Sequence, residues 1–306
     1  MRNAFVRTIS ELMEKDERVF LLTADMGYFI FDAIRQRFPK RFVNVGIAEA
    51  NMVGVACGLA LSGKIPFAYT VASFITCRAF DQIKIDLCYQ QANVKLVGAG
   101  VGMAYGTSGP THQEIADISL MRSLPGMTIL SPADAVDAAA ITWAAYRHHG
   151  PLYMRLENQG EPMVNKERSG FKIGKGVVLR EGRDATIIAV GSIINNALKA
   201  HVELAKEGVS VKVINMHSLK PVDRELILKS AQETGVILTL EEHTILGGLG
   251  SIVAEVLAED ALTKVKFKRL GMEDTFCLEY GTSSCLHKHY RLDCAYIVKT
   301  IKKLLS

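Results

Sequence analysis

The 306-residue sequence lacks any long uninterrupted apolar stretch. Its longest candidate, residues 45–61, is interrupted by Glu49 and Asn51, whereas a membrane-spanning helix needs about 20 predominantly apolar residues. The N-terminus, residues 1–5, also lacks the apolar core of a secretion signal. We therefore expect no membrane span and no export signal.

Paired cysteine motifs are absent as well. The six cysteines include no Cys-x-x-Cys pair, and most lie in apolar or helical segments. Because disulfide frameworks belong to oxidising compartments, buried reduced thiols predict a cytoplasmic protein. The histidines show no ligand spacing such as His-Glu-x-x-His, so we expect no metal held by this chain alone.

An excess of charge of one sign is also missing. The 36 basic and 32 acidic residues are interleaved and leave a net charge of +4. The densest basic cluster, within residues 35–41, is typical of a solvated helix end rather than of a nucleic-acid-binding face, so we expect no nucleic-acid partner. The hydrophobic content of 49% is ample for a full core, and the length fits two domains.

Short runs rich in β-branched and apolar residues alternate with helix-length segments. This alternation predicts an α/β fold of two consecutive domains, each with a mostly parallel sheet flanked by helices. The polar segment 157–176 holds five glycines or prolines and predicts the linker, so we place the domains at residues 1–165 and 172–306. The predicted strands are 20–23, 42–45, 66–71, 94–99, 127–131 and 152–156, then 185–190, 211–216, 235–240 and 265–270.

Glu49 is the only charged residue between positions 45 and 61, and it follows a predicted strand. Ligands of open parallel sheets bind outside the carboxyl ends of the strands. A carboxylate that loses water there either finds a partner or has its pKa raised, which makes it a candidate for proton chemistry. The alternative is an ordinary glutamate in a first helical turn that reaches solvent.

His112 lies at the end of a glycine-rich loop that follows another predicted strand. Thr111 and Glu114 have the spacing of a capping box, which predicts a helix start at this point. An imidazole at a helix start can act as an acid, a base or an oxyanion donor; a surface histidine in a cap is the alternative. The loop glycines at 98–102 lack the third glycine of a dinucleotide fingerprint, so they predict a tight turn beside a ligand or a subunit.

Two motifs together resemble the pyrimidine-binding domain of transketolases and 1-deoxyxylulose-5-phosphate synthases: Val-Gly-Ile-Ala-Glu-Ala-Asn-Met at 45–52 and Gly-Pro-Thr-His-Gln at 109–113. Full-length members also carry a Gly-Asp-Gly…Asn motif that binds diphosphate through Mg²⁺, and this motif is missing here. The chain thus resembles the second half of a split transketolase, which implies a separate subunit that supplies the diphosphate and Mg²⁺ site. The resemblance continues at 78–82, 124–127, 131–134, 241–243 and 247–250.

The resemblance implies thiamin diphosphate as the cofactor. Glu49 would hydrogen-bond N1′ of its pyrimidine, Phe74 would stack on that ring, and Asp25 and Met26 would lie beside it. His112 would contact the reacting oxygens and assist proton transfer. The implied reaction transfers a two-carbon ketol unit to an aldehyde acceptor. The implied assembly is α2β2, built on a homodimer of this chain.

The match to the family's substrate-binding residues is incomplete. Ser108 stands where transketolases usually have an acidic residue that reads a donor hydroxyl, so the donor stays open. Arg2 and Arg155 match phosphate-contacting arginines, but Phe29 and Gly100 replace two other phosphate contacts. Because fewer charge-assisted contacts weaken phosphate binding, we expect an acceptor other than a small pentose phosphate. The substrate contacts implied are Arg2, Ser108, His112 and Arg155.

Three other functions stay open at this level. One is 1-deoxyxylulose-5-phosphate-synthase-like chemistry on pyruvate, and another is the β component of a 2-oxo acid dehydrogenase. The Gly-Pro-Thr-His-Gln run favours a transketolase over the dehydrogenase. The third is a non-catalytic assembly subunit, against which the isolated Glu49 argues, because a chain without catalysis has no need for a lone carboxylate in an apolar run. We expect the C-terminal domain to support dimerisation rather than chemistry.

Overall fold

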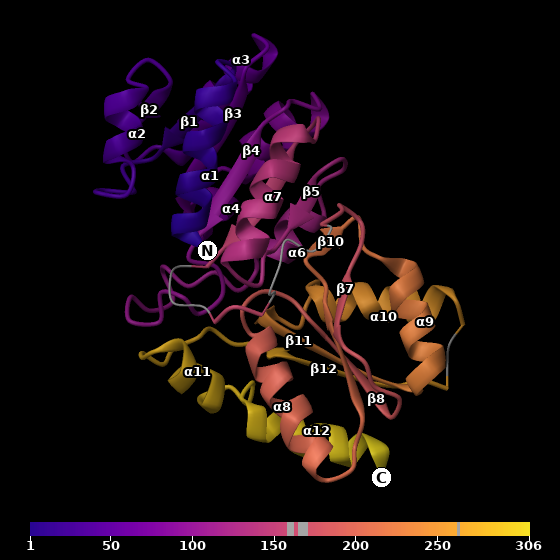
Figure 1. Ribbon diagram of the computed structural model, residues 1–306. Helices are drawn as coiled ribbons and strands as arrows, with labels where there is room; N and C mark the ends of the chain where they lie inside the picture. The colour runs from indigo at the N-terminus through magenta and orange to yellow at the C-terminus, as the bar shows by residue number, and fades with distance from the viewer. Residues whose placement is uncertain (158–161, 165–170, 262–263) are drawn as a thin grey trace.

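The computed structural model describes residues 1–157, 162–164, 171–261 and 264–306. Two α/β units follow one another along the chain, the first in the upper half of Figure 1 and the second below it. The centre of the predicted linker, residues 165–170, lies outside the described residues, so the domain boundary stays a prediction. Among the described residues, no helix is long and apolar enough to cross a membrane.

The first sheet has seven strands in the order β10-β5-β6-β4-β3-β1-β2. All neighbouring pairs are parallel except β10 with β5. Every residue of β3 and β4 is buried, as the central strands of a sheet covered on both faces must be. The strands are β1 (Val19–Thr23), β2 (Phe42–Asn44), β3 (Ile65–Val71), β4 (Lys95–Ala99), β5 (Thr128–Leu130), β6 (Leu152–Leu156) and β10 (Ser218–Lys220).

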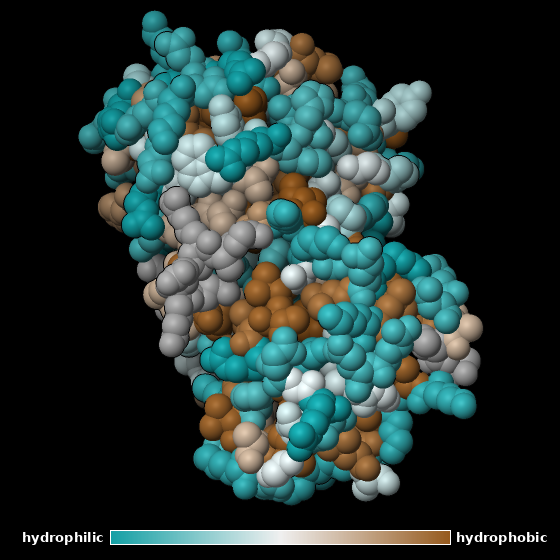
Figure 2. All heavy atoms as spheres, turned by 45° about the vertical axis from the view of Figure 1, so that its right-hand side comes forward, coloured by the Kyte–Doolittle hydropathy of each residue, from teal (hydrophilic) through white to brown (hydrophobic). Residues whose placement is uncertain are grey.

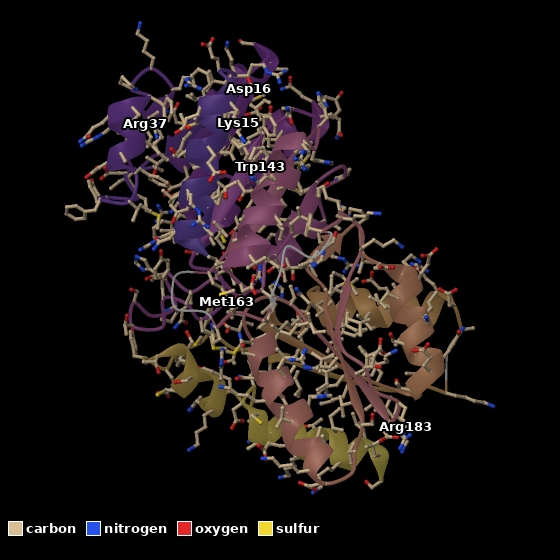
Figure 3. All side chains as sticks on the ribbon, in the orientation of Figure 1. Lys15, Asp16, Arg37, Trp143, Met163 and Arg183 are labelled. Carbon is tan, nitrogen blue, oxygen red and sulfur yellow. The ribbon has the colours of Figure 1, made fainter. Side chains whose placement is uncertain are left out.

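Helices cover both faces of this sheet. Alternate residues of β3 face opposite ways: Phe67 packs in a core with α1 and α7, and Ala68 packs in another with α3, α4 and η1. Figure 3 shows Lys15, Asp16 and Trp143 together where α1 and α7 pack side by side. The helices are α1 (Arg2–Lys15), α2 (Asp32–Arg37), α3 (Glu49–Leu61), α4 (Ala72–Arg78), α5 (Phe80–Gln82), the π-helix η1 (Ile83–Tyr89), α6 (Asp117–Arg122) and α7 (Ala135–Arg147).

The second sheet has five strands in the order β12-β11-β8-β9-β7, parallel except for β7. Helices α8 and α12 cover one face, and α9 and α10 cover the other. The strands are β7 (Val177–Arg180), β8 (Ala185–Ala189), β9 (Val211–Asn215), β11 (Val236–Thr244) and β12 (Lys266–Met272). The helices are α8 (Ile194–Lys206), α9 (Arg224–Thr234), α10 (Leu249–Glu259), α11 (Ser283–His289) and α12 (Cys294–Leu305).

The two units are joined by backbone pairing and by a common hydrophobic cluster. Strand β10 belongs by sequence to the second unit, yet it pairs with β5 at the edge of the first sheet. The Ser131 amide donates to the His217 carbonyl at 2.8 Å, and the Asn215 side chain donates to Asp137 at 2.8 Å. One hydrophobic cluster contains residues of both units. Figure 2 shows hydrophobic surface on the second unit close to its junction with the first. The predicted fold class of two mostly parallel sheets flanked by helices is confirmed.

Candidate functional site

Glu49 opens helix α3, directly after the turn that follows β2. Its side chain is only 4% exposed, and the guanidinium Nη1 of Arg78 lies 3.4 Å from its Oε2. The positive end of the α3 dipole also favours a carboxylate at this position. The half-exposed Arg78 side chain therefore lies between the buried Glu49 carboxylate and solvent.

Arg78 joins Glu49 to two further candidates. Its guanidinium carbon lies 4.0 Å from the centre of the Phe74 ring, in a cation–π contact. The Phe74 ring meets the His112 ring edge-on, with centroids 5.3 Å apart. The structure therefore brings Glu49, Phe74 and His112 together. The sequence analysis assigned no role to Arg78, although this residue opens the motif at 78–82.

The expected helix start at His112 is wrong. Residues 110–112 form turns, and the next helix, α6, begins only at Asp117. The Glu114 side chain does not cap this turn, because it accepts a hydrogen bond from the Ala116 amide at 2.7 Å and forms another with the Thr76 hydroxyl at 2.7 Å. The His112 ring is instead oriented by the Thr111 hydroxyl, 2.9 Å from its Nδ1.

Glu114 is a buried carboxyl group that the sequence analysis did not single out as titratable. Burial raises its pKa to about 7, and the nearby charge of Asp117 acts in the same direction. The Thr76 hydroxyl lies 2.7 Å from Glu114 and 2.8 Å from the carbonyl of Ala72. Since Thr76 has one hydroxyl proton for two acceptors, a protonated Glu114 satisfies this arrangement best. We interpret it as a structural group beneath the His112 loop.

Asp25 and Met26 lie in the loop after β1, at the same edge of the sheet as Glu49. Asp25 has a positive φ of 48°, and its amide donates to Asn44 Oδ1 at 2.9 Å. The Tyr28 hydroxyl donates to the Asp25 carboxylate at 2.6 Å and, together with the Asn44 amide, lowers the pKa of Asp25. Because Asn44 also accepts from the Gly46 amide at 3.0 Å, it ties this loop to the turn before α3.

Ser108 lies in the glycine-rich loop, and Arg2 lies near the Tyr105 ring of the same loop. Ser108 is exposed, with its amide donating to the Tyr105 carbonyl at 2.8 Å. Burial raises the pKa of Tyr105 and the charge of Arg2 opposes that rise, which places Arg2 near this ring. The Tyr105 ring in turn meets the His112 ring edge-on at 6.4 Å. Both residues therefore stay candidates for substrate contacts.

The structure does not support a substrate contact for Arg155. Its side chain is 2% exposed, and its guanidinium donates two hydrogen bonds to Asp117, at 2.6 and 3.0 Å. The Tyr153 hydroxyl donates to the same carboxylate at 2.8 Å. We therefore interpret Arg155 as half of a buried ion pair below the site rather than as a substrate contact. Sequence matching could not reveal this, because Asp117 is distant in the chain.

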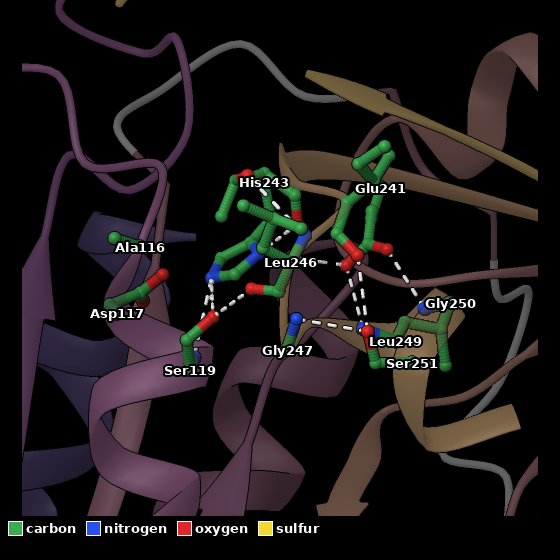
Figure 4. Close-up of polar contacts among 12 residues, drawn as sticks. Ala116, Asp117, Ser119, Glu241, His243, Leu246, Gly247, Leu249, Gly250 and Ser251 are labelled. Atoms are coloured by element: carbon green, nitrogen blue, oxygen red, sulfur yellow. Dashed lines mark hydrogen bonds and ion pairs between the residues drawn. The ribbon is translucent and has the colours of Figure 1, made fainter. Parts of the chain in front are cut away.

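The glycine-rich run at 247–250 donates backbone hydrogen bonds to the carboxylate of Glu241. Figure 4 shows Glu241 accepting hydrogen bonds from the backbone amides of Leu249 and Gly250, at 2.6 and 2.8 Å. Burial raises the pKa of Glu241 to about 7, although these amides oppose the rise. Two residues along the same strand, His243 has its Nδ1 3.8 Å from Oε2 of Glu241, and its Nε2 lies 3.4 Å from the Ser119 amide, across the junction of the two units (Figure 4).

No group of three or more His, Cys, Asp or Glu side chains in the described ranges is arranged to hold a metal ion. The polar groups around Glu49 instead suit an organic ligand. They combine one shielded carboxylate, one aromatic ring and one imidazole within a few contacts of each other. Such a set can hold a nitrogen heterocycle and move a proton beside it.

Comparison with known proteins identifies the family of both units. Residues 1–161 match the transketolase pyrimidine-binding domain, and residues 174–297 match the transketolase C-terminal domain. The chain is 39% identical to a 6-deoxy-6-sulfo-D-fructose transketolase subunit of Clostridium sp., covering 98% of this chain and 92% of the relative. It is 38% identical to an apulose-4-phosphate transketolase subunit of Phocaeicola vulgatus, covering 98% of this chain and 95% of that relative.

Other relatives show how much of a longer enzyme the chain represents. It is 37% identical to 1-deoxy-D-xylulose-5-phosphate synthase of Desulfitobacterium hafniense over 98% of its own length, but over 47% of that enzyme. A solved structure described as a split gene transketolase, an inactive beta4 tetramer, superposes with a TM-score of 0.91 at 41% identity, covering 99% of this chain and 97% of that one. The chain therefore belongs to the transketolase family, within which it comprises the pyrimidine-binding and C-terminal domains.

Proposed function

We propose that this chain and a separate diphosphate-binding subunit together form a thiamin diphosphate enzyme that transfers a two-carbon ketol unit to an aldehyde. The observation that carries this proposal is the shielded carboxylate of Glu49, held within a short chain of contacts that leads through Arg78 and Phe74 to His112. Each of these residues occupies a position that the family motif predicts or opens.

The residues present fit the pyrimidine half of this cofactor. Glu49 offers an acceptor oxygen with little competition from water, and its pair with Arg78 is long enough, at 3.4 Å, to be exchanged for a shorter bond. Phe74 offers an aromatic face, which suits stacking of a heterocycle. When bound, thiamin diphosphate supplies a nucleophilic carbon and an electron sink for the transferred unit.

This chain's own residues would then hold the ring and manage protons. Glu49 would share a proton with the ring nitrogen N1′, and a low-dielectric setting would strengthen that hydrogen bond. His112 would exchange a proton with a substrate oxygen, and the Thr111 hydroxyl, 2.9 Å from its Nδ1, supports a fixed orientation of the ring. Asp25 and Met26, in the β1 loop, would border the cofactor, and Arg2 and Ser108 would contact the substrate.

The proposal includes the assembly. The partner would supply the Mg²⁺ and diphosphate site, because the family's Gly-Asp-Gly…Asn motif is missing from this sequence. The structural relative described as an inactive beta4 tetramer supports self-association of such chains and the need for a partner. We propose a homodimeric core and an α2β2 enzyme. A cytoplasmic location is also proposed, supported by six free thiols.

Calorimetry of thiamin diphosphate with Mg²⁺ tests the split site. We expect tight binding to a mixture of this chain with a partner carrying the Gly-Asp-Gly…Asn motif, and at least a hundredfold weaker binding to this chain alone. A half-site loses the diphosphate contacts and keeps only the pyrimidine contacts. Equally tight binding without the partner, or none to an assembled α2β2 complex, would contradict the proposal.

The substrate is proposed only as a class. The two relatives named above carry different sugars in their names, so an identity near 38% does not fix the sugar substrate. Phe29, at a position where the family has a phosphate contact, is 90% exposed on the β1 loop and offers no charge to a phosphate. We propose an aldehyde acceptor other than a small pentose phosphate, bulkier or unphosphorylated.

Competition between acceptors tests this class. With 3-hydroxypyruvate as donor, we expect ribose 5-phosphate to be a poorer acceptor, by kcat/KM, than an unphosphorylated or bulkier aldose. A preference for ribose 5-phosphate would refute the proposed acceptor class. Product analysis with pyruvate as donor distinguishes the remaining alternative, because decarboxylation with formation of a 1-deoxyketose would mark synthase-like chemistry.

A further inference from the structure

The loop that carries Ser108 and His112 is a closed loop with a defined neck. The Gly102 amide donates to the Glu114 carbonyl at 2.7 Å, and the Glu114 amide donates back to Gly102 at 3.1 Å. Residues 102–114 therefore leave the first sheet and return to the same point. Near its end, the His112 amide donates to the Gly109 carbonyl at 3.1 Å, so the tip and the histidine are linked by backbone.

A buried carboxylate of the second unit holds this neck. Oε2 of Glu242, on β11, accepts the Met103 amide at 2.8 Å. Its other oxygen lies 2.5 Å from Nε2 of His287, on α11. The Asn196 side-chain amide lies 3.2 Å from Nδ1 of His287 and also donates to the Leu292 carbonyl. Because Nδ1 accepts from this amide, Nε2 carries the proton that His287 donates to Glu242.

The second unit also touches the side and the tip of the loop, each time at a glycine. The Gly281 amide donates to the Gly106 carbonyl at 3.2 Å, and a Cβ at Gly106 would overlap the Gly281 carbonyl. A Cβ at Gly109 would lie 2.7 Å from the ring of Tyr280. Gly106 and Gly109 therefore permit close approach of the second unit.

We propose that the second unit positions His112 for the reaction, with Glu242 as the positioning residue at the neck and Tyr280 as the support at the tip. We call the surface formed by Glu242, Tyr280 and Gly281 the loop cradle. Productive geometry of a reacting group depends on such support, since a displacement of about 1 Å can reduce a rate about 100-fold. This inference rests on the proposed role of His112, and it gives the C-terminal domain a part in the chemistry.

The test uses the complex of this chain with its partner. In Glu242→Ala we expect backbone amides of residues 102–109 to exchange hydrogen at least tenfold faster. We expect kcat with 3-hydroxypyruvate and glycolaldehyde to fall about 10- to 100-fold, because His112 is displaced while the cofactor contacts of Glu49 are untouched. Affinity for thiamin diphosphate should stay within about threefold. Glu242→Gln should recover only part of kcat, since its amide oxygen still accepts the Met103 amide while its amide nitrogen then faces the Nε2 proton of His287.

The matched control is Glu241→Ala. Glu241 is the neighbouring carboxylate on β11 and is equally shielded, but its hydrogen bonds to Leu249 and Gly250 stay within the second unit. Glu241→Ala should lower the free energy of unfolding without changing amide hydrogen exchange in residues 102–109. If Glu242→Ala does not fold, Tyr280→Ala provides a second test. This variant should fold, because Tyr280 is 67% exposed and its hydroxyl makes no hydrogen bond in the described part of the chain. It should lower kcat and speed exchange around Gly109.

The outcomes separate this inference from the proposed function. An assembled wild-type complex without ketol transfer would refute the proposed function, and with it the positioning role that depends on it. If the wild-type complex is active and both Glu242→Ala and Tyr280→Ala keep its kcat, the proposed function stands and the positioning role of the loop cradle is refuted. Equal loop exchange in Glu242→Ala and Glu241→Ala would also refute that role, because it would mark a purely structural effect.

Discussion

Ketol transfer by the assembled enzyme should fall about 10²- to 10⁴-fold when Glu49 is replaced by Gln, the range that a positioned acid or base contributes. The substitution keeps the size of the side chain but removes its ability to take and hold a proton. Since the Gln side-chain amide can still donate a hydrogen bond to the unprotonated ring nitrogen, we expect affinity for thiamin diphosphate to change much less than kcat. Steady-state kinetics and calorimetry on the same preparation measure the two quantities.

Glu114→Gln is the matched control for this experiment. Glu114 is also a buried carboxyl group near the site, but its raised pKa of about 7 leaves much of it protonated at neutral pH. Gln mimics that protonated form, so the Thr76 and Ala116 contacts can persist. Transfer should stay within a few-fold of wild type. Comparable losses in Glu49→Gln and Glu114→Gln would argue against a specific proton role for Glu49.

Asp117→Ala should destabilise the fold by about 3–5 kcal/mol, the usual result of removing one partner from a buried ion pair. Arg155 would be left 2% exposed without its carboxylate, and the hydroxyl of Tyr153 would lose its acceptor. A buried guanidinium cannot escape this cost by deprotonation, because its pKa is too high. The free energy of unfolding, measured by urea denaturation of this chain at pH 7, gives the magnitude.

The exposed pair between Arg122 and Glu255 provides the contrast. Glu255 is about half exposed, so Glu255→Ala should cost only about 0–1 kcal/mol. The same denaturation series measures both variants. A cost below about 1 kcal/mol for Asp117→Ala would contradict the interpretation of Arg155 as an ion-paired residue of the core, and would reopen its role as a substrate contact.

Most strands could be predicted from the sequence because apolar runs of a doubly covered sheet are continuous. Strand β6 has the predicted bounds, and β1, β3 and β4 differ from the prediction by one residue. Strands β7 and β10 were missed. Strand β10 is only three residues long, Ser218–Lys220, and has no apolar run of its own; its pairing with β5 depends on how the two units pack.

The candidate site shows the same limit. Glu49 and Phe74 could be found because each stands in a recognisable motif after a strand. The partner of Glu49 could not be assigned, since an ion pair to Arg78 depends on how α4 lies against α3. The capping-box spacing at Thr111 predicted a helix start wrongly, because Glu114 makes its hydrogen bonds to Thr76 and Ala116 instead. A local pattern cannot reveal such a tertiary competitor.

Strand β10 also has a consequence for how the chain is made. The edge of the first sheet at β5 is completed by residues that follow it by about 90 positions. During synthesis that edge stays open until the ribosome has passed residue 220, and an open edge can pair with the same edge of another nascent chain. Truncation before β10 would therefore yield an aggregation-prone fragment. Genetic division of this chain at its linker would separate the first sheet from its edge strand β10.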